Sequence, residues 1–140
     1  MKKSELHALK QFDNEAGGTW RALRSDDEGY RGFGEAYFTW INPGKTKAWK
    51  RHKVATCNLI VPVGEVLFVV ENSVLQGQFT SYNIGVHSYQ RLVIPPGRWF
   101  GFFGAGAQPN LVVNISDLIH DDVECENAPT DTFPFDWSSK

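Results

Sequence analysis

The densest group of chemistry-bearing side chains lies in the segment 45–53, KTKAWKRHK. Alternation along a β-strand places Lys50 and His52 together on one face. The opposite face then carries Lys47, Trp49, Arg51 and Lys53. An ammonium beside an imidazole suits an anionic ligand, or the removal of a proton next to a carbonyl group. The alternative is a solvated basic edge strand without a catalytic role.

Two further stretches bring polar residues next to glycines. The segment 31–35, RGFGE, places Arg31 and Glu35 four residues apart, but it matches neither a P-loop nor a dinucleotide-binding fingerprint. It is alternatively a turn into a strand, with Arg31 in a surface ion pair. The segment 94–102, IPPGRWFGF, is a Pro-Pro-Gly turn that leads into an aromatic strand.

Short apolar runs bounded by Gly, Pro and Asn predict the elements that position these residues. The expected strands are Gly34–Ile41, Ala48–Lys53, Cys57–Val63, Glu65–Glu71, Gln78–Tyr82, Arg91–Ile94, Arg98–Phe103 and Leu111–Ile115. Many short strands at this spacing indicate an all-β sandwich or barrel. Pro62 cannot donate to a ladder, so its strand should lie at an edge or be bulged there.

The two ends of the chain differ from the strand-rich middle. Residues 2–12 predict one short helical turn, and residues 14–29 predict turns around a short piece at Thr19–Leu23. The segment 121–137 is acidic and irregular, and we expect its aromatic residues to hold it against the barrel. These residues are Phe133, Phe135 and Trp137.

Length and composition bound the class of protein. The chain has 140 residues, a single domain's worth, with 41% hydrophobic and 14% aromatic residues, which suits a small barrel with a pocket. A formal net charge of −2 argues against nucleic-acid or polybasic membrane binding. Cys57 and Cys125 have no CxxC spacing, so we expect reduced thiols. Without a signal-peptide pattern or an apolar span, the expected location is the cytoplasm.

Together, the three stretches resemble the dTDP-4-dehydrorhamnose 3,5-epimerase family of the cupin superfamily, over roughly Asp27 to Trp137. The resemblance implies one domain, 1–140, with a cupin-type jelly-roll β-barrel and a short irregular N-terminal segment. It also implies a homodimer that exchanges a segment before Thr46.

The matched motifs assign roles to individual residues. RGFGE is similar to the family's R-G-x-F-x-E strand, which implies that Arg31 meets phosphate and Glu35 lies by the nucleotide. KAWKRHK resembles its R-x-W-H-x-H-K strand, so Lys47 replaces a phosphate-binding Arg, and Trp49 and His52 are kept. IPPG resembles the I-P-x-G turn at residues 94–97.

Three positions depart from the family pattern. Its catalytic His falls on Lys50, its later His falls on Phe100, and its usual proton-donating Tyr is missing from Leu111–Asn114. Metal-binding cupins use the positions of Lys50, His52 and Phe100 as ligands. One imidazole beside an ammonium holds a transition metal poorly, so we expect neither metal nor cofactor.

The sequence thus predicts a nucleotide-sugar epimerase or isomerase that acts on an NDP-4-keto-6-deoxyhexose by removing a proton next to the ketone. Lys50 or His52 is the expected base, and the other stabilises the enolate. The expected substrate-binding residues are Arg31, Glu35, Lys47, Trp49, Arg51, Tyr89 and Asn114. A sugar 3,4-ketoisomerase, or a non-catalytic cupin that binds a nucleotide sugar or a partner protein, remains an alternative.

Overall fold

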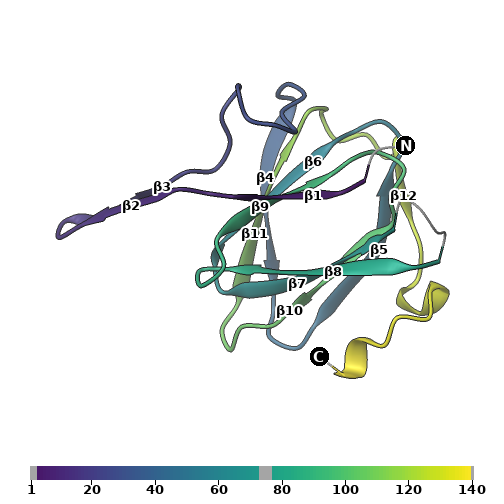
Figure 1. The fold of residues 1–140 in the computed structure, drawn as a ribbon. Coiled ribbons are helices and arrows are strands. Elements are labelled where there is room, and N and C mark those ends of the chain that lie inside the picture. The colour runs from purple at the N-terminus through teal and green to yellow at the C-terminus, as the bar shows by residue number, and fades with distance from the viewer. Residues whose placement is uncertain (1–2, 73–76, 140) are drawn as a thin grey trace.

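The computed structural model describes residues 3–72 and 77–139 and shows two five-stranded antiparallel sheets that face each other (Figure 1). The first sheet has the order β1-β9-β6-β11-β4: Glu5–Ala8, Gln90–Ile94, Cys57–Val63, Asn110–Ser116 and Glu35–Ile41. The second has the order β12-β5-β10-β7-β8: Cys125–Asn127, Thr46–His52, Phe100–Gly104, Glu65–Glu71 and Phe79–Gly85. A hairpin of β2 (Gln11–Asn14) and β3 (Gly17–Trp20) and two short 3₁₀ turns, Thr130–Thr132 and Trp137–Ser139, complete the elements.

The architecture is the all-β, cupin-type jelly roll that the sequence predicts. The strands from β4 to β11 are divided between the sheets in the orders β9-β6-β11-β4 and β5-β10-β7-β8, and every pairing is antiparallel. Each of the eight predicted strands is present, two with the predicted bounds and six with ends that differ by up to three residues. Apolar runs produce these strands because both sheets are covered on their inner face.

The N-terminal expectation is wrong in its element type. Residue 2 lies outside the described residues, but Glu5–Ala8 form strand β1 rather than a helical turn. β1 pairs along the edge of β9, where Leu6 lies opposite Leu92 and packs against the core. Pairing with an open sheet edge satisfies backbone groups that an isolated helical turn would leave to solvent.

The residues between β1 and β4 also contain more regular structure than the sequence predicts. β2 and β3 form a hairpin that extends away from the body of the molecule (Figure 1). Most of its residues are exposed, including Phe12. The N-terminal segment is therefore a strand followed by a projecting hairpin, and only the loop after Trp20 is irregular.

The core fills the space between the sheets. Its buried members come from both sheets and include Leu59, Val61, Phe68, Val70, Leu92 and Val112. Pro62 lies in β6, a central strand, and the β6–β11 register shifts between Leu111 and Val113. The bulge accommodates the proline, as predicted for a strand that is not at an edge.

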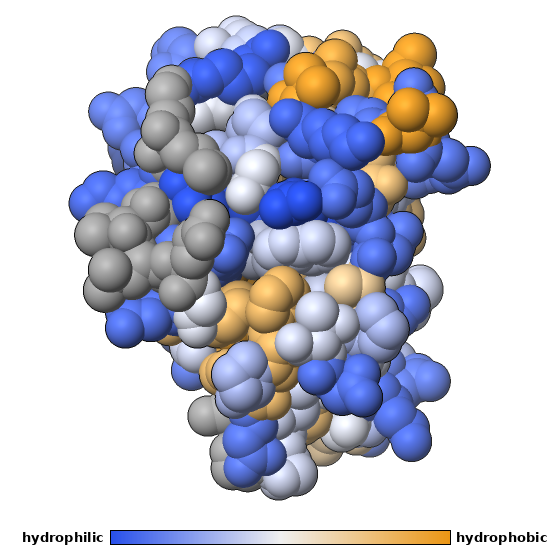
Figure 2. Space-filling view, turned by 90° about the vertical axis from the view of Figure 1, so that its right-hand side faces the viewer, coloured by the Kyte–Doolittle hydropathy of each residue, from blue (hydrophilic) through white to orange (hydrophobic). Residues whose placement is uncertain are grey.

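The C-terminal segment packs on the outer face of the second sheet, as its aromatic residues predict. Phe133, Phe135 and Trp137 join Trp49 and Phe79 in a second hydrophobic cluster. On the molecular face that carries β12 and this segment, hydrophobic residues form patches between mostly hydrophilic neighbours (Figure 2). Among the described residues, no helix has the length and apolarity needed to cross a membrane.

Candidate active site between the sheets

A cavity of about 460 Å³ opens between the two sheets. The first sheet contributes Tyr37, Thr39, Leu59, Val112 and Asn114, and the second sheet and its continuation contribute Lys47, Ala48, Trp49, Lys50, Phe100, Phe102, Asn127 and Ala128. Apolar walls with a few convergent polar groups are typical of small-molecule sites, and this volume accommodates a hexose.

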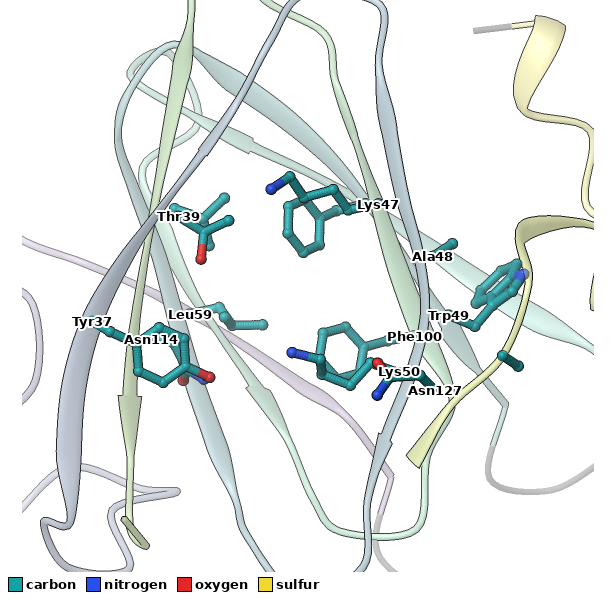
Figure 3. A pocket seen from close by; sticks show the side chains of 13 residues that line it. Tyr37, Thr39, Lys47, Ala48, Trp49, Lys50, Leu59, Phe100, Asn114 and Asn127 are labelled. Atoms are coloured by element: carbon teal, nitrogen blue, oxygen red, sulfur yellow. The ribbon is translucent and has the colours of Figure 1, made fainter. Parts of the chain in front are cut away.

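Two lysines give the cavity its charge. Lys47 is exposed and Lys50 is half-buried, and both side chains reach toward the cavity in Figure 3. None of the residues that line the cavity is Asp, Glu, His or Cys. Within residues 3–72 and 77–139, no carboxylate forms an ion pair with either lysine. The cavity is therefore cationic and suits an anionic or carbonyl-bearing ligand.

The strand alternation predicted for β5 is wrong at its centre. Phe100 of β10 pairs with Lys50, but Gly101 pairs with Ala48, so the register shifts and Trp49 has no partner on β10. This bulge interrupts the period-2 pattern. As a result, Lys47 and Lys50 both line the cavity, although strict alternation assigns them to opposite faces.

Trp49 occupies the outer side of β5. Its ring is 1% exposed and packs edge-on against Phe133, with centroids 5.2 Å apart, and beside Trp137 at 5.4 Å. Its Nε1 donates to the carbonyl oxygen of Thr130 at 3.0 Å. In Figure 3 the indole points away from the cavity. The structure thus separates Trp49 from Lys50 and places its ring among the C-terminal aromatic residues.

His52 lies behind Phe100 rather than in the cavity wall. The two rings stack with centroids 6.2 Å apart, and His52 is 7% exposed. Its Nδ1 lies 2.8 Å from Glu124 Oε1, and its Nε2 is buried without a hydrogen-bond partner among the described residues. Of the two predicted catalytic residues, Lys50 lines the cavity and His52 does not.

Tyr37 is the most notable site residue that the sequence interpretation missed. It lies on β4 directly across from Asn114 on β11, and Asn114 Nδ2 donates to the Tyr37 oxygen at 2.8 Å. Both side chains line the wall opposite Lys50 (Figure 3). Hydropathy alone does not indicate that Tyr37 faces inward. It favours inward positions for the apolar neighbours Phe38 and Trp40, but these residues face solvent and are 69% and 54% exposed.

The other predicted binding residues lie outside this cavity. Arg31 lines a second cavity of about 840 Å³ near β1, and its Nη1 donates to the carbonyl oxygen of Tyr30. Glu35 accepts a hydrogen bond from the His120 amide. Arg51 pairs with Glu126 at 2.8 Å and lies over the Trp99 ring, and Tyr89 donates to the Arg21 carbonyl oxygen.

Potential metal ligands and thiols are separate from the cavity lining. Glu5, His7 and Glu28 bring ligand atoms within 4.8 Å of one another near the molecular surface. Cys57 and Cys125 are both free and buried, as predicted for reduced thiols. Burial raises the pKa of Cys57 to about 12, so its thiol stays protonated and a poor nucleophile.

Known proteins with similar sequences or structures include sugar epimerases and isomerases. A comparison with protein-family models found no match. The probable low-salt glycan biosynthesis epimerase Agl13 of Haloferax volcanii is 29% identical over 146 residues, which cover 97% of this chain and 94% of that protein. The crystal structure of a dTDP-6-deoxy-D-glucose-3,5-epimerase from Legionella pneumophila has a TM-score of 0.79 at 15% identity, over 95% of this chain and 79% of that one, which shows the shared fold.

A crystal structure of a dTDP sugar isomerase from Desulfovibrio desulfuricans G20 is more similar in sequence. It superposes with a TM-score of 0.92 and is 34% identical to this chain. The match covers 98% of this chain and 92% of the isomerase. The expected family resemblance is therefore confirmed: the chain belongs to the dTDP-sugar isomerase and 3,5-epimerase-like family of cupins.

Proposed function

We propose that this protein is a nucleotide-sugar epimerase or isomerase that acts on an NDP-4-keto-6-deoxyhexose in the cavity between the sheets. The observation that carries the proposal is the position of Lys50. It is half-buried in an apolar-walled cavity of hexose size, beside a second lysine and without a carboxylate partner among the described residues. A nitrogen base in such a place suits proton removal next to a ketone.

In the proposed reaction, Lys50 acts as its neutral amine, and the nitrogen lone pair removes the proton from the carbon next to the C4 ketone. The electron pair of the broken C–H bond moves into the ketone and forms an enolate. The polar groups of the cavity stabilise the enolate oxygen, because preorganised donors in an apolar site interact strongly with developing charge. Reprotonation at carbon completes the reaction.

The diphosphate is assigned to the mouth of the cavity. Lys47 is exposed there, while Lys50 lies deeper, half-buried and paired across β5–β12 with the exposed Asn127. This order supports a role for Lys47 as the phosphate-binding cation and for Lys50 as the base. His52 supports the site from behind Phe100, where its hydrogen bond to Glu124 orients the ring.

We also propose that the protein is a homodimer that exchanges an N-terminal segment before Thr46. The projecting β2–β3 hairpin supports this, because an isolated two-stranded hairpin is marginally stable in water. Strand β4 supports it as well, because this sheet-edge strand exposes Phe38 and Trp40.

The function is tested by incubating the protein with a dTDP-4-keto-6-deoxyhexose in deuterated water. Deuterium should enter the substrate at C3 or C5 far above the uncatalysed rate. Lys50→Ala should lower the exchange rate about 10²- to 10⁴-fold, the range expected for losing a general base. Lys53→Ala, an exposed lysine just past β5, is the matched control and should exchange at the normal rate.

Three results would overturn or narrow this assignment. Binding of the nucleotide sugar without exchange by the unmodified protein would support a non-catalytic cupin. Transfer of the ketone to C3 would indicate a 3,4-ketoisomerase. Normal exchange by Lys50→Ala, together with loss of exchange by His52→Gln, would move the base to His52.

A further inference from the structure

The phenol of Tyr37 has a proton that no described group accepts. Its one hydrogen bond within residues 3–72 and 77–139 comes from Asn114 Nδ2, which donates to the phenolic oxygen at 2.8 Å. The same Nδ2 lies 3.5 Å from Cys57 Sγ, which is a weak acceptor. In this orientation of the Asn114 amide, the nitrogen faces Tyr37 and Cys57. The phenolic hydrogen is therefore free to point into the cavity.

Tyr37 and Lys50 lie on opposite walls of the cavity. Tyr37 belongs to β4 of the first sheet, and Lys50 belongs to β5 of the second. Figure 3 shows their side chains on either side of the open space. Both residues line the same cavity. A flat enolate between the sheets would present one face to the amine and the other to the phenol.

We propose that Tyr37 is the acid that returns a proton to the substrate carbon, on the face opposite Lys50, and that Asn114 positions it. This inference rests on the proposed function. The balance is complete within the site: Lys50 takes the proton from carbon, the enolate electron pair forms the new C–H bond with the Tyr37 proton, and solvent restores both groups. Because removal and return occur on opposite faces, the carbon is inverted.

The family's usual proton-donating tyrosine is missing from Leu111–Asn114, and the position of Tyr37 explains how this chain compensates. Asn114 and Tyr37 are directly paired across β11 and β4, so a side chain on the neighbouring strand reaches the same part of the cavity. Asn114 is 5% exposed, and its Oδ1 is buried without a partner among the described residues.

The environment of Tyr37 suits an acid. Burial raises the pKa of the phenol above its ordinary value, and Cys57 adds to the rise, whereas the hydrogen bond from Asn114 lowers it. The phenol therefore keeps its proton at neutral pH and gives it up only to a strong base such as the enolate carbon. Once the proton has left, the Asn114 N–H stabilises the phenolate.

The test separates proton exchange from inversion in deuterated water. With Tyr37→Phe, Lys50 should still remove the proton and return deuterium to the same face. Deuterium therefore enters the substrate within about 10-fold of the normal rate, while inversion falls at least about 100-fold. Asn114→Ala should raise the ratio of exchange to inversion in the same direction, a change that a purely structural role would not cause.

A control and a second variant keep the test decisive. Tyr82→Phe removes a phenol that contacts Ser4 outside the cavity, and it should leave both rates unchanged. If Tyr37→Phe folds poorly, Tyr37→Phe combined with Asn114→Leu removes both hydrogen-bonding partners and should show the same exchange without inversion.

The outcomes for the two proposals are distinct. Inversion by Tyr37→Phe at close to the normal rate, or a ketone shift by the unmodified protein, overturns the role of Tyr37. An absence of exchange in the unmodified protein instead overturns the proposed function.

Discussion

Glu124 shows how one side chain can hold several parts of the site together. Its carboxylate accepts hydrogen bonds from His52 at 2.8 Å and from the amides of Val54 and Ala55 at 3.1 and 2.9 Å. Burial by itself raises the pKa of Glu124, but these hydrogen bonds lower it to about 2. The end of β5, and with it the wall that carries Lys50, therefore depends on an ionised carboxylate.

This pKa predicts a pH dependence of stability. Because the pKa of Glu124 is depressed in the folded protein, its contribution is fully present above pH 5 and is lost as the pH falls toward 2. Glu124→Gln should lower the free energy of unfolding by about 2 kcal/mol at pH 7 and flatten its fall between pH 5 and 2. Urea unfolding at several pH values measures both effects.

The exposed Glu15 supplies the control for this measurement. Glu15→Gln should follow the pH dependence of the unmodified protein. Equal slopes for Glu124→Gln and Glu15→Gln between pH 5 and 2 would show that the hydrogen bonds of Glu124 do not stabilise the fold.

Trp49 links β5 to the C-terminal segment. It is 1% exposed, and its ring contacts Phe79, Phe133 and Trp137. Trp49→Ala should destabilise the protein by about 3–5 kcal/mol and make the C-terminal segment susceptible to limited proteolysis. Ile119→Ala, at a side chain that is 74% exposed, should cost about 0.5 kcal/mol or less. Similar losses of stability for both variants would contradict the packing described for the C-terminal segment.

At the scale of elements, the close approach of β5 and β10 shapes the cavity wall. A Cβ at Gly101 would lie 2.5 Å from the Ala48 Cβ, at the site of the register shift. Gly101→Ala should therefore destabilise the protein by about 1–3 kcal/mol through overpacking. Adding Ala48→Gly removes the clashing methyl group and should recover at least half of that loss.

Urea unfolding measures the free energy of unfolding of the unmodified protein, both single variants and the double variant. These four values give the coupling energy between Gly101 and Ala48 directly. If the stability losses of the two single variants simply add in the double variant, the two strands separate freely at this point. That result would contradict the tight pairing that the structure shows.

The strands were predictable from the sequence because glycines, prolines and asparagines mark their ends. Segments such as Cys57–Val63 and Glu65–Glu71 have the predicted bounds. The helical turn expected at residues 2–12 was wrong, because the strand β1 there depends on the open edge of β9, which local propensity does not report.

The candidate site was only partly predictable for two physical reasons. The bulge in β5 follows from its pairing with β10, so alternation alone misplaced Lys47 relative to Lys50. The inward direction of Tyr37 opposes the hydropathy of β4, where the aromatic residues Phe38 and Trp40 face outward. Both errors concern contacts between strands that are distant in sequence.

At the scale of the whole molecule, the exposed apolar residues of β4 and the projecting hairpin predict a dimer. Sedimentation equilibrium at micromolar concentration should give twice the 15.8 kDa mass of one chain. Replacing residues 11–20 with a short Gly-Ser linker should weaken the association, because it removes the hairpin. A mass of one chain for the unmodified protein would contradict the exchange of an N-terminal segment.

The central claim is that the cavity between the sheets holds the sugar while it reacts. The most direct measurement is a crystal structure with a dTDP-4-keto-6-deoxyhexose, or with dTDP and an unreactive sugar analogue. We expect the hexose ring between Lys50 and Tyr37, with the diphosphate near Lys47. A nucleotide sugar bound instead in the second cavity, beside Arg31, with the space between Lys50 and Tyr37 empty, would contradict the account.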